Sequence, residues 1–252
     1  MYKRQVTANL LLPADFDGSK PLPTIIYGYG GFSVSLTPSF DSDAIAWVEK
    51  GNIWAYPHLR GGSEQGENWH KEGMRDKKQN TFNDLYAFVE FMVESGFSKS
   101  TSIGLWGGSN GGLLAGAAIT QRPELFKAVI SEAALLDMLN FHEYGLGDTW
   151  LDEYGDPRIP SERLWLEKYS PFHNIKVDEQ YPITLVANFK NDSRVDTMHG
   201  RKFAAKLEEL ALNKDDIYLY TEEDAGHTST NFTKSVELSS TYLGFFETQL
   251  SK

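Results

Sequence analysis

Short apolar segments alternate with helical patterns along most of this chain, and several of the segments end in glycine. The segments that we interpret as strands are 24–31, 52–62, 101–108, 127–133, 183–189 and 216–223. Such alternation predicts an α/β fold with a mostly parallel central sheet and helices on both faces. Because ligands bind outside the carboxyl ends of the strands in such sheets, we expect the chemistry in the strand-to-helix loops.

Between these strands the sequence predicts amphipathic helices. Thr81-Phe-Asn-Asp84 has the form of a capping box, so we expect a helix that starts at Thr81 and stops at Gly96. Further helices are predicted within 110–123, where the helix ends before Pro123, over 201–210, and from Asn231 to near the C-terminus. Residues 134–178 are rich in aromatic side chains and have no clean period, and we expect an irregular insertion that caps the site.

The composition is that of a globular chain. Hydrophobic residues make up 40% of the 252 residues and charged residues 23%, which excludes a disordered protein. Residues 1–252 contain no strong linker, so we expect a single domain. With 24 basic and 35 acidic side chains the net charge is −11, which argues against nucleic acid and anionic membranes as partners.

The chain has no cysteine, which excludes disulfides, thiolate zinc sites, iron–sulfur clusters and a cysteine nucleophile. No apolar run approaches the ~20 residues of a spanning helix. The N-terminal sequence MYKRQVTANLLLP shows no signal peptide. The sequence leaves open whether the protein is cytoplasmic or periplasmic.

The strongest chemical signal is Gly107-Gly108-Ser109-Asn110-Gly111, which fits G-x-S-x-G where a strand turns into a helix. This is the context of a nucleophile elbow, in which a strained serine projects its Oγ above the sheet. Side chains at the flanking glycines would collide with the neighbouring strand and helix. The N–H of Asn110 opens the helix and can face a developing oxyanion.

A serine nucleophile needs a base and a residue that orients the base, and in this fold the chain order is serine, acid, histidine. His227 lies in the loop after strand 216–223, and we predict that it is the base. For the acid, Asp192 and Asp196 compete in the loop after strand 183–189. We favour Asp192, which is nearer the strand end, whereas Asp196 reads as a first-turn helix residue.

For the other five histidines we expect ordinary polar contacts, because they precede the serine, lie in the irregular region or begin a helix. They are His58, His70, His142, His173 and His199. The second oxyanion donor should come from the loop after strand 24–29, where Tyr27 and Tyr29 lie. A tyrosine hydroxyl can donate as a backbone N–H does, but the spacing allows equally that these tyrosines only cover the sheet.

Several longer motifs resemble the catalytic domain of the prolyl oligopeptidase family, from about residue 8 to the end. They are Tyr-Gly-Tyr-Gly-Gly-Phe at 27–32, Asn-Trp-His-Lys at 68–71, Gly-Gly-Ser-Asn-Gly-Gly-Leu-Leu at 107–114, Gln-Arg-Pro-Glu-Leu-Phe at 121–126, Tyr-Ser-Pro-Phe-His-Asn at 169–174 and Ala-Gly-His at 225–227. The resemblance implies an α/β-hydrolase fold, and it implies a triad of Ser109, Asp192 and His227 with no metal or other cofactor.

The resemblance also implies roles that spacing does not give. Tyr29 matches the tyrosine that completes the oxyanion hole beside the N–H of Asn110, and Arg194 matches an arginine that binds a substrate carbonyl. An apolar proline pocket is implied, and its matching residues are Phe32, Leu135, Trp165, Tyr169 and Val195. An indole face suits the flat, apolar pyrrolidine ring.

The implied activity is that of a serine endopeptidase that hydrolyses short peptides after proline through an acyl-enzyme. The family's seven-bladed β-propeller is absent from these 252 residues, so we expect a fragment of a longer enzyme with that N-terminal domain as its partner. Alternatives are an esterase or dipeptidyl-type peptidase on the same fold, or a non-catalytic peptide-binding fragment. We identify no pair of acids of the kind that a dipeptidyl enzyme uses to hold a substrate amino terminus.

Overall fold

A computed structural model describes residues 5–227 and 231–251. These residues form one seven-stranded sheet in the order β1-β3-β2-β4-β5-β6-β7. Only β1 is antiparallel to its neighbour, and the remaining pairs are parallel. The strands are β1 Ala8–Leu11, β2 Thr24–Tyr27, β3 Ile53–Pro57, β4 Ile103–Gly108, β5 Ala128–Glu132, β6 Ile183–Phe189 and β7 Ile217–Glu222.

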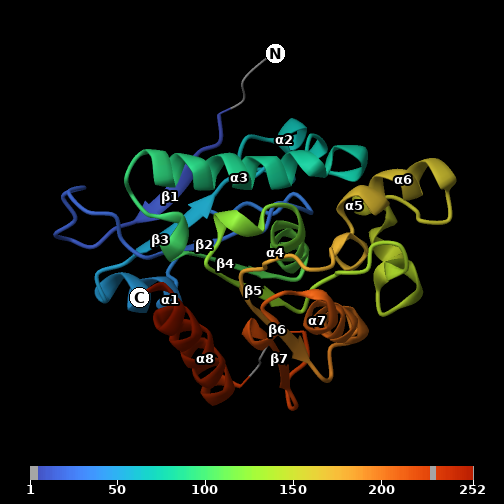
Figure 1. Ribbon diagram of the computed structural model, residues 1–252. Helices are drawn as coiled ribbons and strands as arrows, with labels where there is room; N and C mark the ends of the chain where they lie inside the picture. Colours follow the sequence, from blue (N-terminus) through green and yellow to red (C-terminus); the bar gives the residue numbers. More distant parts are fainter. Residues whose placement is uncertain (1–4, 228–230, 252) are drawn as a thin grey trace.

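Helices cover both faces of the sheet, as the sequence predicts (Figure 1). Neighbouring residues of one strand lie on opposite faces of the sheet. In β2, Ile26 belongs to one apolar cluster and Ile25 to the other, and in β4, Leu105 and Trp106 are divided in the same way. The helices are α1 Ser42–Glu49, α2 Glu67–Lys71, α3 Gln79–Glu94, α4 Asn110–Gln121, α5 Leu151–Tyr154, α6 Pro160–Tyr169, α7 Met198–Leu210 and α8 Phe232–Leu250. Helices α3, α4 and α7 pack on the first face, and α1 and α8 on the second.

The six predicted strands are all present, although glycine-containing tails such as 28–31 and 58–62 lie outside them. Strand β1 was not predicted. It has only four residues, all half-buried at the sheet edge, so it leaves no alternating pattern.

The capping box predicted at Thr81 is wrong. Helix α3 begins two residues earlier, and the Thr81 hydroxyl donates instead to the carbonyl oxygens of Arg60 and Gly73. The Asp84 carboxylate pairs with the Arg60 guanidinium. Thr81 and Asp84 are both buried, so they bind tertiary partners instead of forming the local cap. The stop at Gly96 is confirmed, since α3 ends at Glu94 and Gly96 has a φ of +76°.

Residues 134–178 contain more regular structure than expected. They include helices α5 and α6, which lie beyond the sheet on the right of Figure 1. Helix α6 starts with Pro160 in its first turn, and only Leu166 and Tyr169 among its residues are buried. Because so few positions face the core, the segment shows no helical period.

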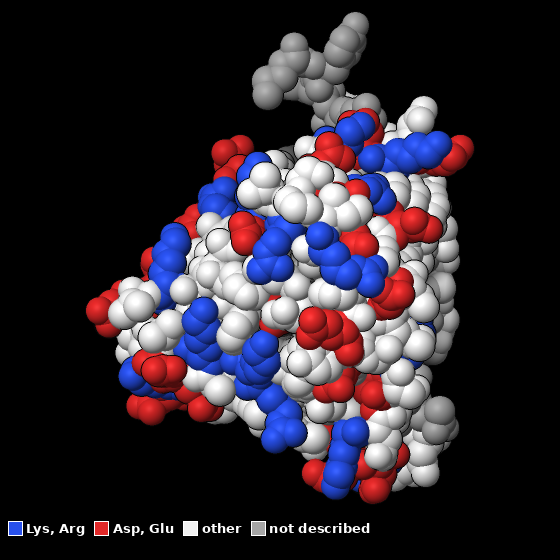
Figure 2. Space-filling view, turned by 90° about the vertical axis from the view of Figure 1, so that its right-hand side faces the viewer, with Lys and Arg blue, Asp and Glu red and all other residues white. Residues whose placement is uncertain are grey.

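The face beside α5, α6 and α7 carries charges of both signs. Figure 2 shows Lys and Arg side chains lying among Asp and Glu over this surface. Among the residues that the structure describes, no helix is long and apolar enough to cross a bilayer.

Candidate active site

The turn between β4 and α4 holds Ser109 in a strained backbone conformation, with φ 56° and ψ −116°. Close backbone approaches force this turn. A Cβ on Gly107 would lie 2.0 Å from the carbonyl oxygen of Gly111, and a Cβ on Gly111 would lie 2.3 Å from that of Gly28. The collisions expected from the sequence therefore occur, and they bring strand, helix and the loop after β2 together behind the serine.

Two possible oxyanion donors lie beside Ser109. The hydroxyl of Tyr29, which lies two residues after the end of β2, is within hydrogen-bonding reach of the Ser109 side chain. Asn110 is the first residue of α4, where backbone N–H groups have no partner within the helix. Burial raises the pKa of Tyr29, so its hydroxyl stays protonated and can donate at neutral pH.

Asp192 and His227 form a hydrogen-bonded pair. The Nδ1 atom of His227 lies 2.7 Å from the Oδ2 atom of Asp192, and because a carboxylate only accepts, Nδ1 carries the proton. The other carboxylate oxygen accepts from the N–H groups of Arg194 and Val195 at 2.8 and 3.0 Å. Burial alone would raise the pKa of Asp192, but the bonds from His227, Val195 and Arg194 outweigh it, and the pKa lies below the ordinary value.

The competing acid has another partner. The carboxylate of Asp196 accepts the N–H of Met198 at 2.8 Å, at the start of α7. Asp196 thus precedes the helix that it was expected to begin, although it does bind backbone N–H groups there. The imidazole of His227 contacts Asp192.

The loops after β5, β6 and β7 meet beside this pair. Ala133, Phe189 and Ala225 form a small apolar cluster, and the Asn191 N–H donates to the Ala225 carbonyl at 3.2 Å. Glu132, whose backbone carbonyl accepts the Ser109 N–H at 2.8 Å, has a carboxyl group close enough for His227 to lower its pKa. Burial is the larger effect and raises the pKa of Glu132 to about 7.

The residues implied for a proline pocket belong to one apolar cluster. Leu135, Tyr169 and Val195 are buried in it, and Phe32 and Trp165 pack against it with part of their surface free. Trp165 is held by a 2.9 Å hydrogen bond from its Nε1 to the Tyr154 carbonyl, whereas the buried Tyr169 hydroxyl has no partner among the described residues. Arg194 is exposed and close enough for its charge to act on Tyr29.

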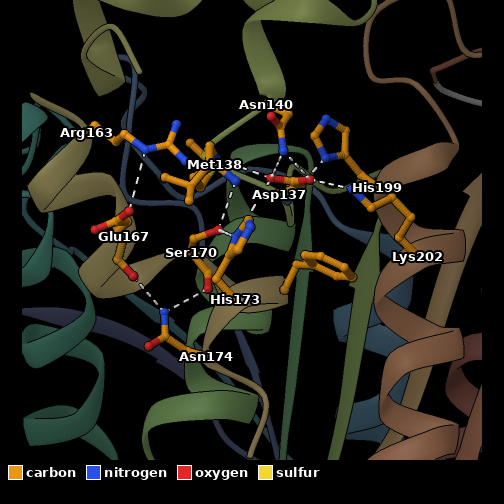
Figure 3. Close-up of polar contacts among 12 residues, drawn as sticks. Asp137, Met138, Asn140, Arg163, Glu167, Ser170, His173, Asn174, His199 and Lys202 are labelled. Carbon is orange, nitrogen blue, oxygen red and sulfur yellow. Dashed lines mark hydrogen bonds and ion pairs between the residues drawn. The ribbon is translucent and has the colours of Figure 1, made fainter. Parts of the chain in front are cut away.

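A buried polar network follows Leu135 in the chain (Figure 3). The Asp137 carboxylate accepts from the Asn140 amide and, at 2.5 Å, from the Lys202 ammonium. The Asp137 N–H donates to Nδ1 of His199 at 3.2 Å, so the ring proton of neutral His199 lies on Nε2. The network ties the turn after Leu135 to α7.

Of the four histidines left, His58, His70 and His173 make the polar contacts that the sequence favoured, whereas Nδ1 of His142 is buried with no hydrogen-bond partner among the described residues. His70 donates to Glu153 at 2.7 Å, and His58 lies against Thr7 and Asn9. Within residues 5–227 and 231–251, no three His, Asp or Glu side chains are grouped as metal ligands would be.

Comparison with known proteins identifies the family. The sequence profile of the "Prolyl oligopeptidase family" matches residues 38–252. The chain belongs to the prolyl oligopeptidase family. It is 39% identical over 215 residues to a prolyl endopeptidase of Elizabethkingia miricola and 38% identical, also over 215 residues, to prolyl oligopeptidase A of Amanita bisporigera. These alignments cover 85% and 84% of this chain but only 30% and 28% of the relatives.

Solved structures give the same assignment and an α/β-hydrolase fold. A structure from a study of two prolyl endopeptidases superposes with a TM-score of 0.92 at 37% identity, covering 98% of this chain and 39% of that one. A post-proline cleaving enzyme from Rickettsia typhi gives 0.90 at 34% identity, covering 98% and 36%. Oligopeptidase B from Leishmania major gives 0.94 at 29%, covering 98% and 35%. The chain thus spans about a third of these prolyl oligopeptidase-family relatives.

Some polar residues near the prolyl oligopeptidase motifs were missed from the sequence. Lys78 and Glu153 are buried beneath the loop that carries Tyr29 and Phe32. Lys78 sits in a charged run, Asp-Lys-Lys-Gln, which favours a solvated surface. No local pattern shows that one lysine of such a run points inward.

We predict that His199 makes stability fall in mild acid. Burial lowers the pKa of His199 from 6.5 to about 4, so between these values the unfolded chain binds a proton that the folded chain does not. The contribution of His199 to the free energy of unfolding is therefore complete above about pH 6.5 and falls by about 3 kcal/mol as the pH drops to 4. In His199→Asn, the side-chain oxygen of asparagine can accept the same bond but does not titrate. The part of the slope of unfolding free energy against pH that comes from His199 should therefore disappear.

Urea unfolding followed by circular dichroism across this pH range measures the effect. The control His58→Asn keeps His199 and should keep the wild-type slope. An unchanged slope in His199→Asn would contradict the assignment.

Proposed function

We propose that this chain is the catalytic part of a serine peptidase that cleaves short peptides after proline. The observation that carries the proposal is the Asp192–His227 hydrogen bond, which lies at the same edge of the sheet as the strained Ser109. Family membership and relatives named prolyl endopeptidase support it. Ser109 is proposed as the nucleophile, His227 as the base and Asp192 as the residue that orients the base.

In the proposed reaction His227 accepts the Ser109 proton on Nε2 as Oγ bonds to the substrate carbonyl carbon. Asp192 holds the Nδ1 proton in place and stabilises the imidazolium that forms. The C–N bond then breaks, and His227 returns its proton to the leaving amine. Water, deprotonated by the same imidazole, hydrolyses the acyl-enzyme ester and regenerates Ser109.

The proposed oxyanion hole is formed by the Tyr29 hydroxyl and the Asn110 N–H. Negative charge develops on the substrate oxygen only in the tetrahedral state, so donors fixed in advance stabilise that state selectively. Loss of one such donor typically costs about 3–4 kcal/mol in activation free energy. The proximity of Tyr29 to Ser109 supports its role.

Selectivity is proposed to come from the apolar cluster around Trp165. A proline side chain has no N–H and no charge, so it loses little on transfer to an apolar surface lined by Phe32, Trp165 and Val195. Arg194 is proposed to donate to a substrate carbonyl and so to set the register of the bound peptide.

We further propose that a β-propeller, encoded ahead of this segment, is its partner in the complete enzyme. The support is that the chain matches only about 30% of the length of its curated relatives. Sequencing the gene upstream of the Met1 codon tests this, and an in-frame series of propeller repeats is expected. An in-frame stop codon just ahead of Met1 would contradict it.

We predict that Ser109→Ala abolishes two activities together, cleavage of a Gly-Pro-amide substrate and covalent labelling by a fluorophosphonate. Both reactions need the Ser109 Oγ as nucleophile. Ser95→Ala, at an exposed position after α3, should behave as wild type. Labelling that survives in Ser109→Ala would refute the nucleophile, and peptide binding without turnover by folded wild type would favour a binding fragment.

Selectivity gives a separate prediction. Wild type should cleave Gly-Pro-amide with a higher kcat/KM than an Arg-amide or a short acyl ester, and Trp165→Ala should lower kcat/KM for the proline substrate by about 10–100-fold, since a well-packed aromatic contact is worth roughly 1–3 kcal/mol. The ester should be affected less. Equal cleavage of the Arg-amide would reject proline selectivity while leaving the hydrolase intact.

A further inference from the structure

Lys78, the residue just before α3, is a buried cation that the proposed reaction does not use. Its side chain is only 1% exposed. Its ammonium donates to the Gly30 carbonyl at 2.9 Å and to Oδ1 of Asn110 at 3.1 Å. The nearest carboxylate oxygen belongs to Glu153, at 3.6 Å, and the Tyr154 ring centroid lies 5.5 Å from Nζ. The charge is therefore bonded to the Asn110 side chain and to the backbone carbonyl of the residue that follows Tyr29.

The Asn110 amide is held in one orientation by these neighbours. Its Oδ1 accepts from the Lys78 ammonium and, at 2.9 Å, from the Tyr154 hydroxyl. Its Nδ2 donates to the Tyr29 carbonyl at 2.6 Å. One side chain thus joins the residue that offers the backbone N–H to the residue that offers the phenol.

The loop from Gly28 to Phe32 is fixed at three backbone atoms. Lys78 binds the carbonyl of Gly30, Asn110 binds that of Tyr29, and Oε1 of Glu153 accepts the Phe32 N–H at 3.0 Å. Phe32 has a φ of +54°, which is strained for a residue with a side chain. Such a conformation persists only where the surroundings hold it.

A buried ammonium is costly, so it is a poor device for stability alone. Here Glu153 is shared, since its second oxygen accepts from His70 at 2.7 Å. What the ammonium adds is a fixed positive charge and two strong donors in a region of low dielectric constant. Both effects are directed at the residues that would meet the oxyanion.

We propose that Lys78 is a positioning residue of the oxyanion hole, whose ammonium, acting through the Asn110 side chain and the Gly30 carbonyl, aligns the Tyr29 hydroxyl and the Asn110 N–H on one substrate oxygen. This inference rests on the proposed function. Lys78 does not touch the substrate, so its removal should raise the barrier to acylation and leave substrate binding nearly unchanged.

The charge on Lys78 gives the proposal a pH signature. Burial lowers the pKa of Lys78 to about 8, against the opposing effect of Glu153. The titratable groups that face it are Glu153 and Tyr154 from α5, with His70 of α2 behind Glu153. Wild-type kcat should therefore fall as the pH rises through about 8, where Lys78 loses its proton.

The experiment compares wild type, Lys78→Met and the control Lys71→Met, an exposed lysine paired only with Glu67 among the described residues. With a Gly-Pro-amide substrate at pH 7, Lys78→Met is expected to lower kcat by about 10–100-fold with KM within about threefold. This loss is smaller than that for removal of an oxyanion donor, because both donors stay in place and only their alignment is lost. Lys71→Met should match wild type. The ratio of wild-type kcat to Lys78→Met kcat should fall toward one as the pH rises through 8, because wild type then loses the charge that the variant lacks.

A second variant covers the case in which Lys78→Met does not fold. Asn110→Ala keeps the backbone N–H but removes the amide through which Lys78 acts, so it should show a similar loss in kcat. In the double variant the two losses should not add. Wild-type kcat in folded Lys78→Met, a ratio that stays constant with pH, or unchanged kcat in Asn110→Ala would each overturn the proposal.

The experiment distinguishes failure of the proposed function from failure of this inference. Wild type that neither cleaves the substrate nor reacts with a fluorophosphonate would overturn both. Active wild type together with equally active Lys78→Met would overturn the role of Lys78 alone.

Discussion

The contact between the end of β4, the start of α4 and the loop after β2 is the constraint from which the site is built. Backbone atoms of Gly107, Gly111 and Gly28 approach so closely that a Cβ on Gly107 or Gly111 would overlap the next carbonyl oxygen. The chain can turn there only through a strained residue, and that residue is Ser109. The packing that strains the serine also places Tyr29 beside it, so the proposed nucleophile and the proposed oxyanion donor are positioned by the same contact.

Burial of both sheet faces determines where polar chemistry can occur. Aromatic side chains such as Trp54 and Trp106 fill one face, and aliphatic residues of α3 and α4 cover the other. Charged groups are therefore confined to the strand ends and the loops. The Asp192–His227 pair lies in two such loops, after neighbouring parallel strands β6 and β7, whose carboxyl ends lie at one edge of the sheet.

Local patterns predicted much of the fold and of the candidate site, because the elbow, the strand ends and the chain order each follow from short-range rules. Thr81 shows their limit: its capping pattern is real, but buried carbonyl oxygens of Arg60 and Gly73 compete for the hydroxyl. Lys78 shows the same limit for the site, since a lysine becomes an internal donor only when distant carbonyls converge on it.

The proposed acid–base pair and the Asn110 side chain differ in how many parts of the fold are needed to position them. Asp192 and His227 are each placed by one loop and bind each other, so the strand that precedes each is enough to locate them. The Asn110 side chain is placed by residues from three separate segments, Lys78, Tyr154 and Tyr29. Its orientation exists only after tertiary packing is complete. Alignment of the proposed oxyanion donors is therefore a property of the assembled fold, whereas the proposed acid–base pair is a property of two adjacent loops.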